Sequence, residues 1–200
     1  MIESSDALRS LYPDPKPRAL QKQLDHLDEH CARFIGLSPF VIVASGDATG
    51  RLDASPRGGT PGFVHVLDQH TLLLPDATGN NRLDTLTNIT STGRVGLLFL
   101  IPGMDETLRV NGTARLGTES ELLRHFAGAS RAPTLVMAVT VEEAYLHCAK
   151  ALMRAKLWSA ESRIDRGRLP TYGQMINDQI GCTDPPETQE AMLARYAPEL

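Results

Sequence analysis

Apolar positions in this chain gather in short runs whose length is typical of β-strands. The most apolar run, residues 95–101, suits a central strand, and residues 107–114 alternate polar and apolar positions as a half-buried strand does. Gly, Pro, Asn and Asp residues punctuate the runs as turns. Because short turns join successive strands, the pattern favours a mainly β fold, a β-barrel with flanking helices, over a doubly wound parallel sheet. Further strands are predicted at 39–44, 51–55, 63–67, 71–74 and 134–141.

Helical spacing is found near both ends of the chain and in two connections. The recurrence of Leu20, Leu24 and Leu27 predicts a long helix over 18–35, which Gly36 ends. We expect one compact domain made of an N-terminal extension and helix at 1–36, the barrel at 37–160 and a helical extension at 161–200. Other helices are predicted at 81–89, 119–126 (capped by Thr118 or Ser120), 144–158, 172–180 and 186–196.

Composition and charge exclude several classes of function. A net charge of −4 argues against binding to nucleic acid or to a membrane surface, and an aromatic content of 5% argues against a base-stacking surface. No apolar run approaches the roughly 20 residues of a membrane span, and no signal peptide is recognisable. Three widely spaced cysteines (Cys31, Cys148 and Cys182) form no CxxC pair. The sequence therefore predicts a cytoplasmic protein with reduced thiols.

Candidate binding chemistry is concentrated in residues 71–86, TLLLPDATGNNRLDTL. A Pro-Asp pair ends the predicted strand, a Gly-Asn-Asn turn follows, and Arg82 opens the predicted helix. Unpaired N–H groups and partial positive charge at a helix N-terminus suit a phosphate group, and an arginine there strengthens the site. Arg57, in the predicted loop 56–62, would converge with Arg82 if strands 63–67 and 71–74 pair. The alternative is a capped surface helix with a solvated arginine.

Other patterns carry weaker signals. As a helix, 144–158 would place His147, Lys150, Arg154 and Trp158 on about one face, either to capture an anion or as a solvated basic face. Consecutive helical residues point about 100° apart, which disfavours a nucleophilic pair of Cys148 with His147. The chain has no GxGxxG after its first strand and no GxxxxGK[ST].

No metal site is predicted from the histidines. Among the six in the chain, only His26 and His30 have the i, i+4 spacing that aligns side chains on a helix. The sequence contains no HExxH, and the acidic residues around this pair are typical of a solvated helix face.

Taken together, several stretches resemble a known family. DASPRGGTPGFVHVLDQHTLLLPDATGNNRLDTLTNI, then VGLLFLIPGMDETLRVNGTARL and YLHCAKALMRAKLW, are similar to the pyridoxamine 5'-phosphate oxidase-like flavoproteins, which are FMN-binding split β-barrels. The resemblance covers roughly residues 35–160 and is to a subgroup of uncharacterised FMN-dependent proteins. The C-terminal substrate-phosphate signature of the true oxidases is not found.

The resemblance implies where FMN binds. The family's phosphate segment at a helix start corresponds to Asn80-Asn81-Arg82, which has one basic residue fewer, so Arg82 and Arg57 would share the phosphate charge. A polar residue of the strand after the apolar run reaches the flavin, and a late tryptophan contacts the cofactor region. The implied cofactor-binding residues are Ser55, Pro56, Arg57, Leu74, Pro75, Asn80, Asn81, Arg82, Leu83, Thr107, Arg109 and Trp158.

The resemblance further implies a homodimer with FMN at the subunit interface, acting as an FMN-dependent oxidoreductase on a small molecule. Hydride chemistry belongs to the flavin ring, so no acid–base residue is required and no catalytic residue is predicted. One alternative is a flavin-binding or sensing module without turnover. A weaker one is heme or F420 binding on the same barrel.

Overall fold

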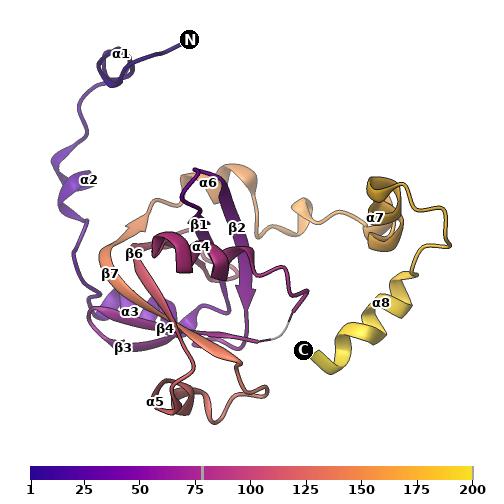
Figure 1. Cartoon of the computed structure of the whole chain (residues 1–200). Coiled ribbons are helices and arrows are strands. Elements are labelled where there is room, and N and C mark those ends of the chain that lie inside the picture. The colour runs from indigo at the N-terminus through magenta and orange to yellow at the C-terminus, as the bar shows by residue number, and fades with distance from the viewer. Residues whose placement is uncertain (78, 200) are drawn as a thin grey trace. The chain divides into compact units, whose positions relative to one another are not determined.

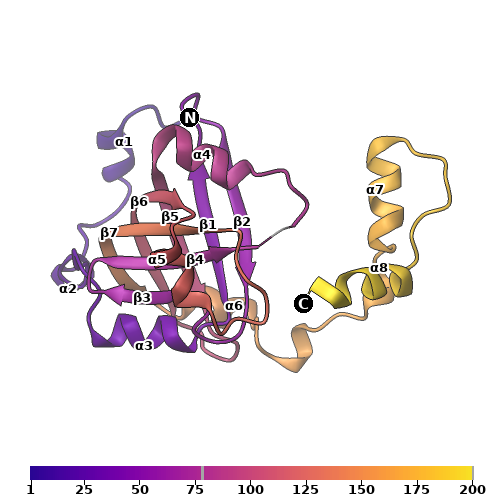
Figure 2. The same ribbon diagram turned by 60° about the horizontal axis from the view of Figure 1, so that its bottom comes forward.

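The structure is a computed structural model that describes residues 1–77 and 79–199. Within these residues seven strands form one sheet in the order β2-β1-β5-β6-β7-β4-β3, with every neighbouring pair antiparallel (Figure 1). In Figure 2, β1 and β2 run across β3, β4 and β7, so the sheet is strongly coiled. The predicted split β-barrel with flanking helices is confirmed. The strands are β1 (Phe40–Gly46), β2 (Leu52–Gly58), β3 (His65–Asp68), β4 (Thr71–Asp76), β5 (Arg94–Leu100), β6 (Thr107–Gly117) and β7 (Leu135–His147).

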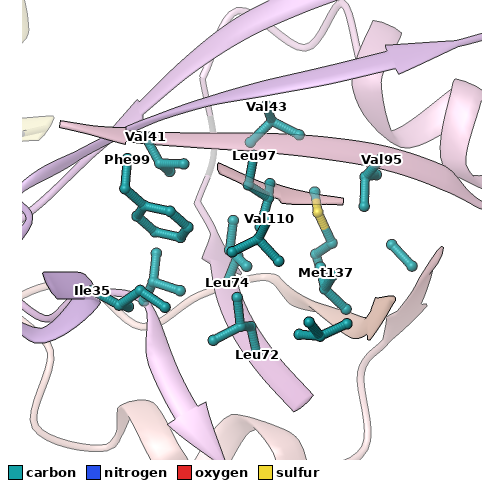
Figure 3. Close-up of a cluster of buried hydrophobic side chains, with 14 of the residues drawn as sticks. Ile35, Val41, Val43, Leu72, Leu74, Val95, Leu97, Phe99, Val110 and Met137 are labelled. Atoms are coloured by element: carbon teal, nitrogen blue, oxygen red, sulfur yellow. The ribbon is translucent and has the colours of Figure 1, made fainter. Parts of the chain in front are cut away.

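The core lies inside the coiled sheet and is made by alternate residues of its strands. Phe99, Leu97 and Val110 are at most 1% exposed, and α3 (Glu29–Leu37) adds Ile35 at 0% (Figure 3). Residues between these positions point outward, because successive side chains of a strand alternate between its two faces. The run 95–101 is thus a central strand, as predicted, since β5 lies between β1 and β6.

The predicted helix over 18–35 is wrong, because the chain leaves helical geometry in its middle. Short α2 (Pro17–Gln21) ends early, and Leu24 exchanges two backbone hydrogen bonds with Ala144 of β7, at 3.0 and 2.8 Å. Asp28 then caps α3 by accepting a hydrogen bond from the Cys31 N–H at 2.8 Å. Pairing with a distant strand outweighs local helix periodicity here. Upstream, α1 spans Ser5–Arg9.

The predicted helix 144–158 is also wrong over its first third. Strand β7 continues to His147 because it stays paired with β6 as far as the Thr107–His147 register, and only α6 (Lys150–Ala155) is helical. His147 therefore lies on a strand and does not share a helix face with Lys150.

Three further boundaries differ from the predictions. β2 extends through Pro56 to Gly58, which an edge strand permits because a proline there interrupts no inner hydrogen-bond ladder. β4 continues through Pro75 and Asp76, paired with β7. The helix predicted at 119–126 is α5 (Ser120–Leu123) followed by the 3₁₀ turn η1 (Arg124–Phe126). Its N-cap is Glu119, without a side-chain cap, and is neither Thr118 nor Ser120.

Residues 159–200 form a separate compact unit from residues 1–158. Its helices α7 (Tyr172–Ile180) and α8 (Gln189–Tyr196) are capped by the hydroxyls of Thr171 and Thr188. Short 3₁₀ turns at η2 (Ala160–Ser162), η3 (Arg166–Arg168) and η4 (Ala197–Glu199) complete the unit. In the described part of the chain no helix has the length and apolar character to cross a membrane.

Candidate functional site

Polar side chains alternate along the inner face of edge strand β2. Asp53, Ser55 and Arg57, here named the β2 strip, lie opposite buried core-face residues of β1. All three are half-buried, because β2 has no neighbouring strand on its outer side to cover them. The core face of the sheet thus ends at this edge in a row of hydrogen-bonding and charged groups.

One end of the strip is joined to β4 by an ion pair. Arg57 Nε lies 3.5 Å from Asp76 Oδ1, and the two side chains are 26% and 17% exposed. The strands concerned stand far apart in the sheet order, so the pair bridges the open side of the coiled sheet. Burial raises the pKa of Asp76, and the neighbouring guanidinium of Arg57 lowers it by less.

The other end of the strip holds the start of α4 (Asp84–Thr92). The Asp53 carboxylate accepts hydrogen bonds from the hydroxyls of Thr85, at 2.5 Å, and of Ser55, at 2.9 Å. Thr85 is only 2% exposed. A second bond, from Asn88 Nδ2 to Ser45 Oγ at 3.0 Å, secures α4 to β1. The helix N-terminus is thereby held beside the β2 strip.

The connection before α4 differs from the prediction. The helix begins at Asp84, so Arg82 precedes it and does not open it. Asn81 and Leu83 are left-handed, with φ of 58° and 60°, and Asn80 Oδ1 accepts the backbone N–H of Arg82 at 3.1 Å. This turn chemistry delays the helix. Leu83, as N-cap, provides no side-chain hydrogen bond, which leaves the N–H groups of the first turn uncapped.

The exposed Arg82 is paired locally. Its Nε donates to Asp84 Oδ2 at 2.8 Å, which lowers the pKa of Asp84, and the side chains are 74% and 47% exposed. The charge of Asp53 also acts on Arg82. Arg82 and Arg57 are therefore both associated with the β2 strip, near opposite ends of it, and each has its own carboxylate.

The remaining predicted residues fall into two environments, β4 and the β6 end of the sheet. The Leu74 side chain is 2% exposed in the core, and Pro75 pairs with β7. At the start of β6, Thr107 is buried, and Arg109 Nη1 donates to Tyr145 Oη at 3.0 Å. Trp158 Nε1 donates to the Met104 carbonyl at 2.7 Å, in the connection before β6. Thr107, Arg109 and Trp158 thus belong to the β6 end of the sheet.

Sequence reasoning missed three residues that organise the β2 strip: Asp53, Asp76 and Thr85. The alternation of polar residues in LDASPRG was a usable signal, since it continues the strand past Ser55 to Arg57. The partners of Asp53 and Asp76 lie 32 and 19 positions away in the chain and have no local signature. In the described residues no group of three or more His, Cys, Asp or Glu side chains could hold a metal ion.

Comparisons with known proteins agree with this architecture. A crystal structure of a variant of HupZ from Group A Streptococcus aligns with a TM-score of 0.51 at 21% identity, over 60% of this chain and 98% of that one, which shows a shared fold. An FMN-binding protein from Syntrophomonas wolfei is a weaker likeness, with a TM-score of 0.46 at 11% identity over 58% of this chain and 84% of that one. A comparison with curated proteins found no match.

The sequence profile of the family described as pyridoxamine 5'-phosphate oxidase matches residues 27–148, more than half of the chain. This range contains the β2 strip, the connection to α4 and the start of β6. The chain belongs to the pyridoxamine 5'-phosphate oxidase-like family.

Proposed function

We propose that this protein binds FMN and acts as an FMN-dependent oxidoreductase on a small molecule, as a cytoplasmic homodimer. The observation that carries the proposal is the position of Arg82 beside the uncapped N-terminus of α4, at one end of the β2 strip, with Arg57 at the other end of the same strip. Membership of a family of flavin-binding split barrels supports FMN as the ligand.

The residues present fit a phosphate monoester. The first-turn N–H groups of α4 lack a side-chain cap, and the helix dipole places partial positive charge there. Arg82, two residues before the first residue of the helix, is mostly exposed and can turn from Asp84 to a phosphate. Arg57 is ion-paired with Asp76, so it would contribute positive charge from its present position at the other end of the strip. Asn80 and Asn81 supply the turn that brings Arg82 to this position.

When bound, FMN supplies a ring that accepts and passes on a hydride equivalent. The contribution of this chain is to hold the phosphate and to present polar groups near the ring. Arg109 and Thr107 lie at the start of β6; with FMN at the interface of the proposed homodimer, the Arg109 guanidinium would stabilise negative charge on the ring. Trp158, tied to the connection before β6, would contact the same region.

The homodimer is supported by the outer face of the sheet. Ile42 and Leu98 are register partners on β1 and β5 and are half-buried on the side away from the core, as are Phe40 and Leu100. A contiguous apolar patch of this kind is a common site of association. A measured solution mass of twice the chain's own would support the dimer, and a mass equal to one chain would contradict it.

The direct test of cofactor binding is a titration of FMN into cofactor-free protein. Arg82→Ala should weaken binding by about 1.5–3 kcal/mol, or roughly 10- to 150-fold in Kd, because a charge-assisted hydrogen bond is lost. Arg94→Ala is the matched control, since Arg94 is also an exposed arginine paired with a carboxylate, Glu142 at 2.9 Å. Equal dissociation constants for parent and Arg82→Ala would remove Arg82 from the site.

Absorbance and rapid reduction separate the enzyme from the alternatives. Purified protein with a flavin band that NADPH or another donor reduces over many turnovers supports the oxidoreductase. A flavin band that donors do not reduce indicates a binding or sensing module. A Soret band would indicate that the ligand is heme and not FMN, and the absorbance spectrum of F420 would indicate F420.

A further inference from the structure

A second group of cationic side chains surrounds Tyr145 on β7. Lys22 Nζ lies 5.3 Å and Arg109 Cζ 5.6 Å from the centre of the tyrosine ring, and the His147 ring centre lies 5.2 Å away. We name these four residues the β6–β7 cluster. Lys22 reaches it from the segment that pairs with β7 at Leu24, where its Nζ donates to the Leu146 carbonyl at 2.5 Å.

The positive charges of this cluster have no carboxylate partner among the residues that the structure describes. Arg109 donates to the Tyr145 hydroxyl, and Lys22 donates to a backbone carbonyl. Glu143, two residues from Tyr145, is engaged elsewhere, since its two oxygens accept from Asn111 and Gln23 at 2.9 Å each. Two cations are therefore held beside one aromatic ring without a neutralising charge.

The other two side chains of the β6–β7 cluster, His147 and Tyr145, have unused hydrogen-bonding capacity. His147 Nε2 is buried and has no partner among the described residues. Burial lowers the pKa of His147, and the charges of Arg109 and Lys22 lower it further, which keeps the imidazole neutral near pH 7. The Tyr145 hydroxyl accepts from Arg109 and keeps its own hydrogen for another acceptor. Ammonium, guanidinium, phenol and imidazole groups thus all retain the capacity to donate.

We propose that the β6–β7 cluster binds the carboxylate or phosphate group of the small-molecule substrate. The substrate part of this inference rests on the proposed function, whereas the anion site itself does not. An anionic oxygen would pair with both cations at once and accept from the phenol and imidazole, which is the donor set that a carboxylate or phosphate requires. The substrate class is therefore a small organic anion.

The cluster is distinct from the site proposed for the FMN phosphate. Arg109 pairs in register with Leu98 and lies on the outer face of β6, between the core residues Leu108 and Val110. The β2 strip lies on the core face, three positions away in the sheet order. One anion therefore cannot occupy both.

The test is a titration of inorganic phosphate, and separately of acetate, into FMN-loaded protein. Binding is monitored through the imidazole NMR signals of His147. Loading with FMN removes the competing site at Arg57 and Arg82. We expect saturable movement of the His147 signals and a Kd about tenfold higher or more in Lys22→Gln and in Arg109→Gln. Arg94→Gln should bind like the parent. Circular dichroism and the melting temperature identify variants that have lost the fold, and Lys22→Gln should keep the FMN affinity of the parent.

Each result bears on the proposal. Unmoved His147 signals, or equal Kd values in folded Lys22→Gln and parent, would overturn it. Phosphate binding that disappears when FMN is loaded would also overturn it, since the site would then be the flavin's. A protein that takes up no FMN but still binds phosphate or acetate through these residues would support the anion site. That result would overturn only the proposed flavin function. Tighter binding of phosphate than of acetate supports a phosphorylated substrate, and the reverse supports a carboxylic acid.

Discussion

The two cationic regions of this barrel differ in how their charge is balanced. Around the β2 strip, Arg57 faces Asp76 and Arg82 faces Asp84. In the β6–β7 cluster, Lys22 and Arg109 face a tyrosine and a neutral histidine. In the first region each arginine already has a carboxylate partner without a ligand. The second keeps two positive charges whose compensation must come from outside the described chain.

Because of this difference, substitutions in the two regions should affect stability and ligand binding to different extents. A ligand phosphate at the β2 strip must compete with carboxylates that already hold the arginines, so part of its interaction energy replaces existing ion pairs. An anion at the β6–β7 cluster replaces nothing except water, and it relieves repulsion between neighbouring cations. Substitutions in the first region should therefore alter folding as well as binding, whereas those in the second should act mainly on binding.

The largest expected effect in the β2 region is on its anchor to α4. Thr85→Val removes the hydroxyl of a residue that is 2% exposed and leaves Asp53 without its closest donor. We expect the free energy of unfolding to fall by about 1–3 kcal/mol, because a charge-assisted hydrogen bond from a buried residue is lost while Asp53 keeps only its bond from Ser55. Chemical denaturation measures this loss. Thr90→Val, an exposed position of the same helix whose hydroxyl bonds only to its own helix, should cost far less. Equal losses would show that the Asp53 bond contributes nothing.

A smaller effect, with a defined sign, is expected for the bridge between β2 and β4. Burial raises the folded-state pKa of Asp76, so the folded protein binds this proton more readily than the unfolded chain does. Ionisation of Asp76 therefore lowers stability as the pH rises from about 3.8, its ordinary pKa, through the raised folded value. Asp76→Asn abolishes this loss, so across that window the variant should gain unfolding free energy relative to the parent.

Denaturation series between pH 3.5 and 7 would check the sign, with Asp84→Asn as the matched comparison. The pKa of Asp84 is lowered by the hydrogen bond from Arg82, so its contribution to stability is present above its ordinary pKa and is lost as the pH falls. The free energy of unfolding of Asp84→Asn should therefore fall relative to that of the parent as the pH rises, whereas that of Asp76→Asn should rise relative to the parent. If the free energy of unfolding, relative to the parent, changed with pH in the same direction for both variants, the two aspartates would not have pKa values shifted in opposite directions.

The smallest expected effect concerns competition for Arg82. Asp84 is 47% exposed, so its replacement by Asn should change the unfolding free energy only slightly. Freed of its carboxylate, Arg82 becomes available to the phosphate, and FMN affinity should rise about two- to fivefold. Equilibrium titration of FMN measures the change. Weaker binding in Asp84→Asn would mean that Asp84 orients Arg82 and does not compete for it.

Local pattern was sufficient for much of the fold. The run 95–101 and the alternation in 107–114 predicted central strands β5 and β6, and the order of short turns predicted antiparallel pairing. These features depend on residues close together in the chain, where apolar period and turn chemistry act directly. Family resemblance rested on similarly local stretches, and the profile match over 27–148 confirms it.

Element boundaries that depend on distant partners were not predictable in the same way. The segments 18–35 and 144–158 both have helical spacing, yet Leu24 pairs with Ala144 and His147 stays in register with Thr107. Each pairing satisfies backbone groups that a helix would otherwise satisfy, and the gain comes from a partner that local periodicity does not contain.

By itself the sequence determined a mainly β barrel, its family and the identity of the two arginines that we propose for phosphate binding. Only the tertiary structure decided what each charge faces: Asp76 opposite Arg57, Thr85 beneath Asp53, and Lys22 with Arg109 around Tyr145. The reason is physical. Strand and turn propensities act over a few residues, whereas electrostatic balance depends on distances through space, which are set only when the sheet closes.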